Sequence, residues 1–328
     1  MNKFWDNYPE IQSKLEFVKM NMLKVSKNGN SYLNNSFDYL FSTSGKMLRP
    51  AFIIIGSMLK NIPLTKEKEI IVNNLAAAVE MLHSATLIHD DIIDDSFLRR
   101  GKEAIHSKYS KEHAVYMGDF LFSECFLMLS NLEIPKEVVI KLAEGISTIC
   151  KAEMLQNYYR YDFNVTDEQY LKIISGKTAV LFGISLSIGA AQLDFDEEEL
   201  KKIFNIGFNV GMAFQITDDI LDFISEESVI GKDVKSDILK GYYTLPIILS
   251  FNTEYKNEIK SFFDKESLSD DDLINIYNLI HKSGALEKSK LIAENYTSKA
   301  INELNEFEES AGKKVMREIL PVLLKRSY

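Results

Sequence analysis

The sequence predicts an all-α protein, a single-domain bundle of roughly ten or more helices that spans residues 1–328. Apolar residues recur at the i, i+3, i+4, i+7 spacing of helices over most of the chain, and no run of alternating strands competes with that period. No linker rich in Pro, Gly or Ser divides the chain. Hydrophobic residues make up 46% of it, which is enough for a large core.

The expected helices follow one another along the chain and are separated by turn residues, such as "SKNGNS" at 26–31 and "NLEIP" at 131–135. Their ranges are 3–22, 49–59, 66–94, 112–130, 136–158, 177–192, 197–223, 244–253 and 286–304.

Charge and cysteine content exclude several classes of protein. The net charge, 38 − 48 = −10, argues against a sequence-independent nucleic-acid binder. Only Cys125 and Cys150 are present, and neither belongs to a CxxC pair, so a reducing cytoplasm fits better than a disulfide framework or a zinc site. The N-terminus is unlike a signal peptide. The apolar stretch 51–59 is shorter than the ~20 residues of a membrane span, so no membrane span is expected.

Aspartates gather where the expected helix 66–94 ends, in "DDIIDD" at 90–95. Asp90 and Asp94 share a face at i, i+4 spacing, and Asp91 and Asp95 form the neighbouring pair. Carboxylates at the C-terminal end of a helix cost stability, because the helix dipole is already negative there. The arrangement is therefore repulsive unless cations fill it, although a solvated helix end is the common alternative.

The same pattern returns in "TDDILD", with Asp218, Asp219 and Asp222 at the end of the apolar segment 203–216. Two DDxxD motifs, each at the end of a buried helix, are hard to explain as solvated surface charges. If the two helices pack side by side, their acidic ends face one another across a shared mouth. Carboxylates together with water and phosphate oxygens suit Mg²⁺, so the missing ligands are expected to be phosphates.

Basic residues lie at expected helix starts or directly after the acidic motifs. A protein of net charge −10 that groups cations beside its acids is expected to bind a polyanion. For any single lysine, a solvated surface charge is the simpler interpretation. The residues concerned are Lys46, Arg49, Arg99, Arg100, Lys177 with Thr178, and Lys232.

With these motifs in this order, the chain resembles the trans-isoprenyl diphosphate synthases, also called polyprenyl synthetases. The resemblance rests on "GKMLRP", "DDIIDDSFLRRG", "GDFLFS", "GKTAVLF", "FQITDDILDF" and "GKDVKSDILKGYYTLP", which follow one another in family order between residues 45 and 246. It implies an isoprenoid synthase-like all-helical fold around a deep central cavity. It also implies Mg²⁺-dependent condensation of an allylic diphosphate with isopentenyl diphosphate.

The resemblance also implies a role for each motif residue. Asp90 and Asp94, supported by Asp91, are expected to bind Mg²⁺ on the allylic diphosphate, and Asp218, with Asp219 and Asp222, a further ion. Arg99 is expected to contact the allylic diphosphate. The residues expected to hold isopentenyl diphosphate are Lys46, Arg49, His83 and Arg100. Those expected around the allylic group and its developing charge are Lys177, Thr178, Gln215 and Lys232. Without the resemblance, His83 would be taken for a hydrogen-bonded core histidine.

The residues just before the first motif bear on product length. Short-chain enzymes resemble one another in placing an aromatic residue there, but this chain has Ala85 and Thr86, and no aromatic from 79 to 89. This favours an open tunnel and a long product of hexa- to decaprenyl length, of the kind used for quinone side chains. Phe126 is the candidate for the tunnel floor, with ordinary core packing as the alternative.

Two departures from the family pattern leave alternatives open. Lys235 stands where the family often has Gly, and Tyr242 stands where shorter-chain members often have Lys. A shorter-chain synthase, such as a geranylgeranyl or farnesyl diphosphate synthase, and the catalytic subunit of a heteromeric synthase are the alternatives. A terpene cyclase has no use for a second diphosphate site, and a non-catalytic subunit would lose aspartates. A homodimer is expected, a small partner subunit remains open, and the lipid product leaves room for peripheral membrane contact.

Overall fold

The structure is a computed structural model that describes residues 3–27, 29–42, 45–223, 238–263, 265 and 268–324. Within these ranges it is built of helices, and its only strands, β1 (Leu98–Arg99) and β2 (Lys102–Glu103), form one hairpin. This confirms the all-α class. The helices are η1 (Lys3–Trp5), α1 (Pro9–Ser26), α2 (Ser31–Ser42), α3 (Leu48–Gly56), α4 (Lys66–Ile93), α5 (Ile105–Lys108), α6 (Lys111–Ser130), α7 (Lys136–Tyr158), α8 (Asp167–Ile174), η2 (Ser175–Ala179), α9 (Val180–Ala190), α10 (Glu197–Leu221), α12 (Leu245–Ser250), α13 (Lys256–Phe263), α14 (Asp270–Lys282), α15 (Ala285–Asn305) and α16 (Ala311–Leu324).

The chain forms two compact units. Unit 1 contains Met1–Ile140, Ser185–Leu200 and Glu308–Val315, and unit 2 contains Lys141–Ile184, Lys201–Phe307 and Met316–Tyr328. Each unit is assembled from segments that are distant in the sequence. That the whole chain is one domain stays a prediction.

Within the described residues, six helices were not anticipated from the sequence: α2, α5, α8, α13, α14 and α16. Serine, asparagine and aspartate are frequent in α2, and these residues favour helix ends over helix interiors. Two of the other helices start with capping boxes, Thr166 with Gln169 in α8 and Ser269 with Asp272 in α14, and such caps stabilise helices whose composition is polar. The first expected helix, 3–22, instead starts at Pro9, because proline suits the first helical position.

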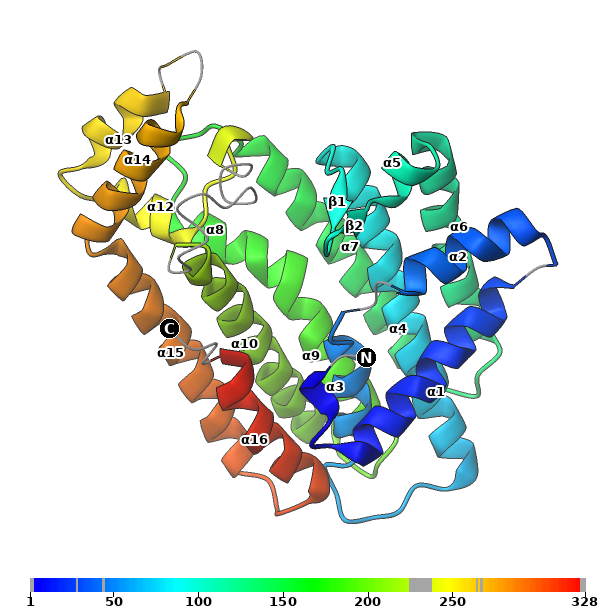
Figure 1. Cartoon of the computed structure of the whole chain (residues 1–328). Coiled ribbons are helices and arrows are strands. Elements are labelled where there is room, and N and C mark those ends of the chain that lie inside the picture. Colours follow the sequence, from blue (N-terminus) through cyan, green and yellow to red (C-terminus); the bar gives the residue numbers. More distant parts are fainter. Residues whose placement is uncertain are drawn as a thin grey trace. The chain divides into compact units, whose positions relative to one another are not determined.

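The core of unit 1 lies around α4, which packs against α1, α3 and α6 (Figure 1). The buried face of α4 carries alanines from Ala76 to Ala78 together with larger residues such as Val79 and Leu82, all at most 1% exposed. The contact face of α6 is a stripe at helical spacing that includes Met117, Leu121 and Leu129. This packing holds the C-terminal end of α4, where the first aspartate motif lies.

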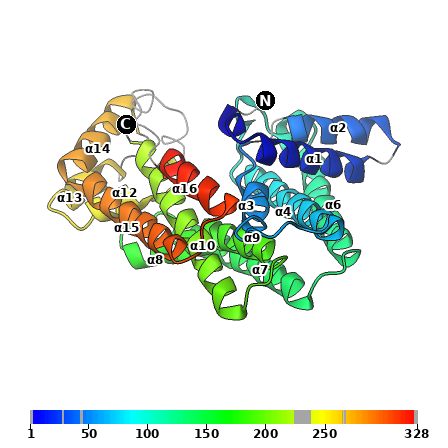
Figure 2. The same cartoon turned by 90° about the horizontal axis from the view of Figure 1, so that it is seen from below.

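The core of unit 2 collects apolar residues from α8, α10, α12, α14 and α15 (Figure 2). Within it, Ile216 and Ile220 of α10 are at most 1% exposed. Tyr277 of α14 donates a hydrogen bond of 2.8 Å to the backbone oxygen of Asp222, just beyond the end of α10. The end of α10, which carries the second aspartate motif, is thereby held in place.

Two helical stretches, Lys66–Ile93 and Asp167–Ala190, are long and apolar enough to cross a membrane, which the short apolar run 51–59 did not suggest. Their most apolar windows are 56% and 83% buried inside the structure. Core helices of soluble proteins pass the same test of length and composition, so this is weak evidence for a membrane span.

Candidate active site

The first aspartate motif ends α4 and divides into outward and inward carboxylates. Asp90 and Asp94 are partly exposed, whereas Asp91 is 5% exposed. Adjacent residues on a helix point about 100° apart, so a pair at i, i+4 faces outward while the residue between them turns inward. Arg99 donates two hydrogen bonds of 2.6 Å from Nε and Nη2 to the Asp91 carboxylate. Asp91 is therefore engaged by Arg99 in the interior, whereas Asp90 and Asp94 lie closer to solvent.

The hairpin after α4 positions both arginines of "LRRG". Arg100 and Gly101 form its turn with φ values of 52° and 76°, and a two-residue turn of this kind requires positive φ at both positions. Glycine accepts this backbone without strain, which explains "RG" at the tip. The strand pairing places Arg99 opposite Lys102. Sequence periodicity missed this hairpin because each strand has only two residues.

A cationic cluster lies beside the hairpin in unit 1. The Arg49 Nη1 atom donates a hydrogen bond of 2.9 Å to His83 Nε2. Burial and the nearby arginines hold the pKa of His83 well below its usual value, so the ring is neutral and accepts this bond. Arg100 lies against Gly45, where a Cβ atom would overlap the guanidinium. Three of the four residues expected to hold isopentenyl diphosphate are thus brought together.

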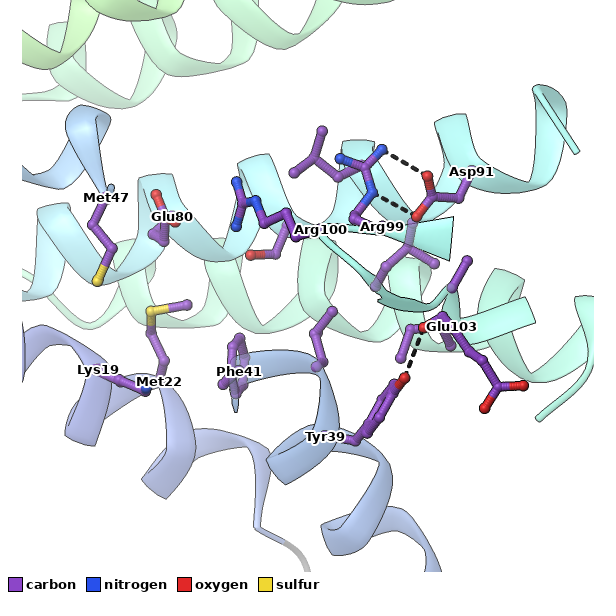
Figure 3. A pocket seen from close by; sticks show the side chains of 16 residues that line it. Lys19, Met22, Tyr39, Phe41, Met47, Glu80, Asp91, Arg99, Arg100 and Glu103 are labelled. Carbon is purple, nitrogen blue, oxygen red and sulfur yellow. Dashed lines mark hydrogen bonds and ion pairs between the residues drawn. The ribbon is translucent and has the colours of Figure 1, made fainter. Parts of the chain in front are cut away.

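Glu80 is a buried carboxylate within this cluster, 8% exposed on α4. Figure 3 shows the Arg100 side chain extending along α4 toward it. Burial raises the pKa of Glu80 to about 7, and the charges of Arg49 and Arg100 oppose that rise. Glu80, Arg100 and Asp91 line a cavity of about 50 Å³ together with apolar residues of α1, α2 and α4. The sequence analysis missed Glu80, although an acid three residues before His83 in an apolar helix was a usable signal.

Lys46, the fourth expected ligand, precedes α3. Its Nζ atom lies 5.2 Å from the centre of the Phe4 ring, and its backbone oxygen accepts a hydrogen bond of 2.6 Å from Trp5 Nε1. Met47 follows in the left-handed conformation, with φ of 50°. The N-terminal residues therefore fix the backbone that carries this lysine.

The second aspartate motif, at the end of α10 in unit 2, repeats the division seen in the first. Asp218 and Asp222 are partly exposed, and Asp219 is 5% exposed. The Tyr170 hydroxyl donates a hydrogen bond to Asp219 Oδ2, and Gln215 Nε2 donates one of 3.0 Å to Oδ1. Burial raises the pKa of Asp219 to about 7, while these hydrogen bonds oppose the rise. Asp219 is therefore held inward, as Asp91 is in the first motif.

The "SGKTA" segment forms a π-helical turn, a distortion that often occurs at functional sites. Lys177 Nζ donates hydrogen bonds of 2.9 Å to Glu153 Oε2 and 2.8 Å to Gln156 Oε1, both on α7. Thr178 Oγ1 donates one of 2.8 Å to Gln215 Oε1. The structure thus links Thr178 and Gln215 to the second motif and ties Lys177 to α7, while their predicted place around the allylic group stays a prediction.

The remaining predicted site features have different outcomes. Lys232 and Lys235 lie outside the described residues. The shared mouth between the two aspartate motifs stays a prediction, because they belong to different units. Tyr242, which stands where shorter-chain members often have lysine, has the Arg160 guanidinium 5.1 Å from its ring centre, and the same guanidinium lies 5.1 Å from the centre of the Tyr161 ring. A cation from the segment after α7 therefore stacks on this tyrosine.

The donor set fits a hard divalent cation that also binds the substrate. Within the described part of the chain, no group of three or more His, Cys, Asp or Glu side chains forms a ready-made metal cage. Each motif instead offers two outward carboxylates, and Mg²⁺ is usually held by one or two carboxylates, waters and substrate phosphates. Asp90 with Asp94, and Asp218 with Asp222, are the residues that would hold such ions.

The residues assigned to product length lie on α4 and α6. Ala85 is fully buried, and the Thr86 hydroxyl donates a hydrogen bond of 2.8 Å to the His83 backbone oxygen. Phe126, the candidate for the tunnel floor, is 44% exposed. Ordinary core packing, the alternative, does not fit this exposure, because the inward stripe of α6 passes through Cys125 and Leu129. The role as tunnel floor stays a prediction.

Phe126→Ala is expected to cost much less stability than the ~3–5 kcal/mol of a buried phenylalanine, because much of its ring already lies in water. Leu129→Ala, which removes a side chain that is 2% exposed on the same helix, is the control and is expected to cost ~2–5 kcal/mol. Chemical denaturation measures both. Equal losses would show that Phe126 packs as core, and a longer product from Phe126→Ala would support the predicted role in chain length.

These features indicate a class of protein. Two helix ends, one in each unit, present a pair of outward carboxylates, and a cationic cluster lies beside the first. Carboxylate pairs and guanidinium groups suit metal-assisted binding of phosphorylated substrates, and together with the motifs of the sequence they indicate a helical isoprenoid synthase.

Comparison with known proteins gives the family. A sequence model described as polyprenyl synthetase matches residues 30–280. Heptaprenyl diphosphate synthase component 2 of Bacillus subtilis is 31% identical over 99% of this chain and 92% of its own. A heptaprenyl diphosphate synthase structure from Staphylococcus aureus superimposes with a TM-score of 0.88 at 32% identity, covering 97% of this chain and 99% of that one. A geranylgeranyl pyrophosphate synthase from Lactobacillus brevis gives a TM-score of 0.90 at 28% identity over 98% and 99%. The chain belongs to the polyprenyl synthetase family and is a prenyltransferase.

Proposed function

We propose that the protein is a long-chain all-trans polyprenyl diphosphate synthase. It adds isopentenyl diphosphate units one after another to an allylic diphosphate such as farnesyl diphosphate, and its product serves quinone side chains. The observation that carries this proposal is the pairing of two outward-facing carboxylate pairs with a separate cationic cluster around Arg49, His83 and Arg100. A second diphosphate needs such a cluster, and a cyclase with one substrate does not.

The reaction places clear demands on these residues. The allylic C–O bond breaks and its electron pair leaves with the diphosphate, so negative charge grows on that group. Asp90 with Asp94, and Asp218 with Asp222, would hold Mg²⁺, which would neutralise this charge. Lys177 on the π turn would add a further cation, and apolar side chains around the allylic group would exclude water from the carbocation. The alkene of isopentenyl diphosphate then forms the new C–C bond, and the departing diphosphate accepts the proton that is lost. No general-base side chain is required.

The cationic cluster is proposed to orient isopentenyl diphosphate. Arginine suits this task, because its planar guanidinium can donate paired hydrogen bonds to phosphate oxygens. Neutral His83 accepts a hydrogen bond from Arg49 and so holds the guanidinium plane, while Glu80 partly balances the buried positive charge. Diphosphate binding would add the negative charge that this cluster lacks.

Partner subunits belong to the same proposal. Relatives named as component 2 of a heptaprenyl synthase support a heteromeric complex, in which this chain would be the catalytic subunit. Self-association is supported by α6, which exposes Val115, Tyr116, Phe126 and Leu127.

A shorter-chain synthase is the second candidate function, favoured by the fold similarity to geranylgeranyl pyrophosphate synthases. We place the activity in the cytoplasm, where free cysteines such as Cys125 and Cys150 persist.

One incubation separates these possibilities. The purified chain is mixed with Mg²⁺, farnesyl diphosphate and labelled isopentenyl diphosphate, and the dephosphorylated products are sized. Products of hexa- to decaprenyl length are expected. A product that stops at geranylgeranyl favours the shorter-chain synthase, activity only after a partner is added favours the heteromer, and no condensation under any condition overturns the proposal.

Ala85→Phe or Thr86→Phe is expected to truncate the product to about the farnesyl or geranylgeranyl stage while condensation continues. Ala85 lies within two turns of Asp90 on α4, and an added ring there would block the path of the growing chain. Product sizing measures the effect, and a melting curve checks for the ~1–3 kcal/mol that overpacking costs.

Ala78→Phe provides the matched comparison. Ala78 is also fully buried and lies seven residues, or two helical turns, further from the motif on the same face of α4. The product of Ala78→Phe is expected to be longer than that of Ala85→Phe by about two isoprene units, because one helical turn rises ~5.4 Å, roughly the length of one unit. Wild-type product length from Ala85→Phe would show that the tunnel does not follow this face.

A further inference from the structure

Asp219 is the centre of a buried hydrogen-bond network that the proposed reaction does not by itself explain. Its carboxylate accepts hydrogen bonds from the Tyr170 hydroxyl of α8 and from Gln215 Nε2, and the backbone N–H of Leu245 at the start of α12 also donates to it. A carboxylate that is 5% exposed needs such donors, because burying it without them is costly. The network joins three helices at the second aspartate motif.

The network continues from Asp219 to the π turn. Gln215 donates through Nε2 to Asp219 and accepts through Oε1 from Thr178, so its amide has only one orientation that satisfies both neighbours. The chain of contacts therefore runs from Tyr170 through Asp219 and Gln215 to Thr178. Thr178 adjoins Lys177, whose ammonium group is held by Glu153 and Gln156.

The inward orientation of Asp219 also affects which carboxylates of the second motif face outward. Asp218 precedes it and Asp222 follows three residues later, and both are partly exposed. Without the Tyr170 hydroxyl, Asp219 would lose one of its donors and would gain by turning toward water. A third carboxylate would then enter the outward group, and the end of α10 would lose its tie to α8.

We propose that Tyr170 is a positioning residue for the second aspartate motif, which orients Asp218 and Asp222 through Asp219 and orients the π turn through Gln215 and Thr178. It is not a catalytic residue, because it is 6% exposed and its hydroxyl is engaged by Asp219. The inference rests on the proposed function, since the metal-bound diphosphate is what the motif would hold. Arg99 does the equivalent for Asp91 in the first motif.

The competing explanation is that Tyr170 serves only to pack the core. The Tyr170 ring belongs to the core of unit 2 with Ile174, Ile216 and Ile220, so removing the whole side chain would only damage that core. Tyr170→Phe keeps the ring and removes one hydroxyl. Tyr159→Phe is the matched control, because it also removes one tyrosine hydroxyl, which accepts a hydrogen bond of 3.0 Å from Gln169 instead of donating to Asp219.

The test uses the full chain and two readouts. The first is calorimetric binding of farnesyl thiodiphosphate, an unreactive analogue, in the presence of Mg²⁺. The second is kcat and KM for each substrate, together with the Mg²⁺ concentration that gives half activity. Tyr170→Phe is expected to weaken analogue binding about tenfold or more and to raise the Mg²⁺ requirement, with the KM for isopentenyl diphosphate unchanged. Tyr159→Phe is expected to match the wild type.

A double variant tests whether Tyr170 acts through Asp219. Asp219→Ala and Tyr170→Phe/Asp219→Ala are expected to bind the analogue equally weakly, because the hydroxyl has nothing left to hold. If the double variant bound the analogue more weakly than Asp219→Ala, by the same factor that Tyr170→Phe costs alone, the proposal would be overturned. A Tyr170→Phe variant that melts at a lower temperature but keeps wild-type Mg²⁺ dependence and analogue binding would also overturn it. Failure of the proposed function itself would appear differently, as a wild-type chain that does not condense the two substrates.

Discussion

Asp90→Ala and Asp218→Ala are each expected to lower turnover about a thousandfold, because a metal ion on a leaving diphosphate is worth several kcal/mol to the transition state. The fold is expected to survive both changes. Each carboxylate is partly exposed and lies next to other carboxylates, so its removal relieves repulsion at the end of a helix. Steady-state rates at saturating Mg²⁺ and thermal melts measure the two effects separately.

Asp95→Ala is the matched control for the first motif. Asp95 belongs to the same acidic run, but its side chain is 59% exposed and pairs with Lys111 at 2.8 Å. Its removal is expected to change turnover less than tenfold, because an exposed ion pair contributes little. If Asp95→Ala impaired turnover as much as Asp90→Ala, the outward pair would not be the metal site. Unchanged Mg²⁺-dependent activity in both Asp90→Ala and Asp218→Ala would contradict the assignment altogether.

The second large effect is expected from the cationic cluster. Arg49→Ala, Arg100→Ala and Lys46→Ala should each mainly raise the KM for isopentenyl diphosphate, by about a hundredfold for the two arginines. Loss of Arg49 also leaves His83 without this hydrogen bond and removes one of the two positive charges that act on Glu80. Kinetics with each substrate varied in turn separate this effect from the allylic site. Lys102→Ala, which removes an exposed hairpin cation bonded to Ser42, is the control and should leave both KM values near those of the wild type.

Arg99→Ala should instead impair use of the allylic substrate. Arg99 holds the Asp91 carboxylate through two bonds of 2.6 Å, so its loss disturbs the turn that carries Asp90 and Asp94 as well as removing a cation. Arg99→Lys should restore little of the lost activity with the allylic substrate, because an ammonium group cannot reproduce the two paired hydrogen bonds to Asp91. Equal effects of Arg99→Ala and Arg49→Ala on both substrates would argue against two separate diphosphate sites.

The two aspartate motifs show which features of the site could be predicted from the sequence. The DDxxD spacing predicts which aspartates share a face, and the structure exposes the outer pair of each motif while burying Asp91 and Asp219. Helical period alone could have shown that division, because position within DDxxD determines the direction of each side chain. The partners of the inward carboxylates could not be read in the same way. Arg99 reaches Asp91 from the strand that follows α4, eight positions further on, and Tyr170 reaches Asp219 from a helix 49 positions away.

By itself, the sequence determined the helical class, the family and the set of charged residues, because periodicity and short motifs are local properties of a chain. Only the tertiary structure decided how those residues are used. Phe126 faces outward although its helix is apolar, Glu80 lies buried among arginines, and Tyr170 is tied to the second motif. The physical reason is that burial and hydrogen bonding depend on which elements pack together. The energy of a buried carboxylate is set by donors that the chain brings from distant positions.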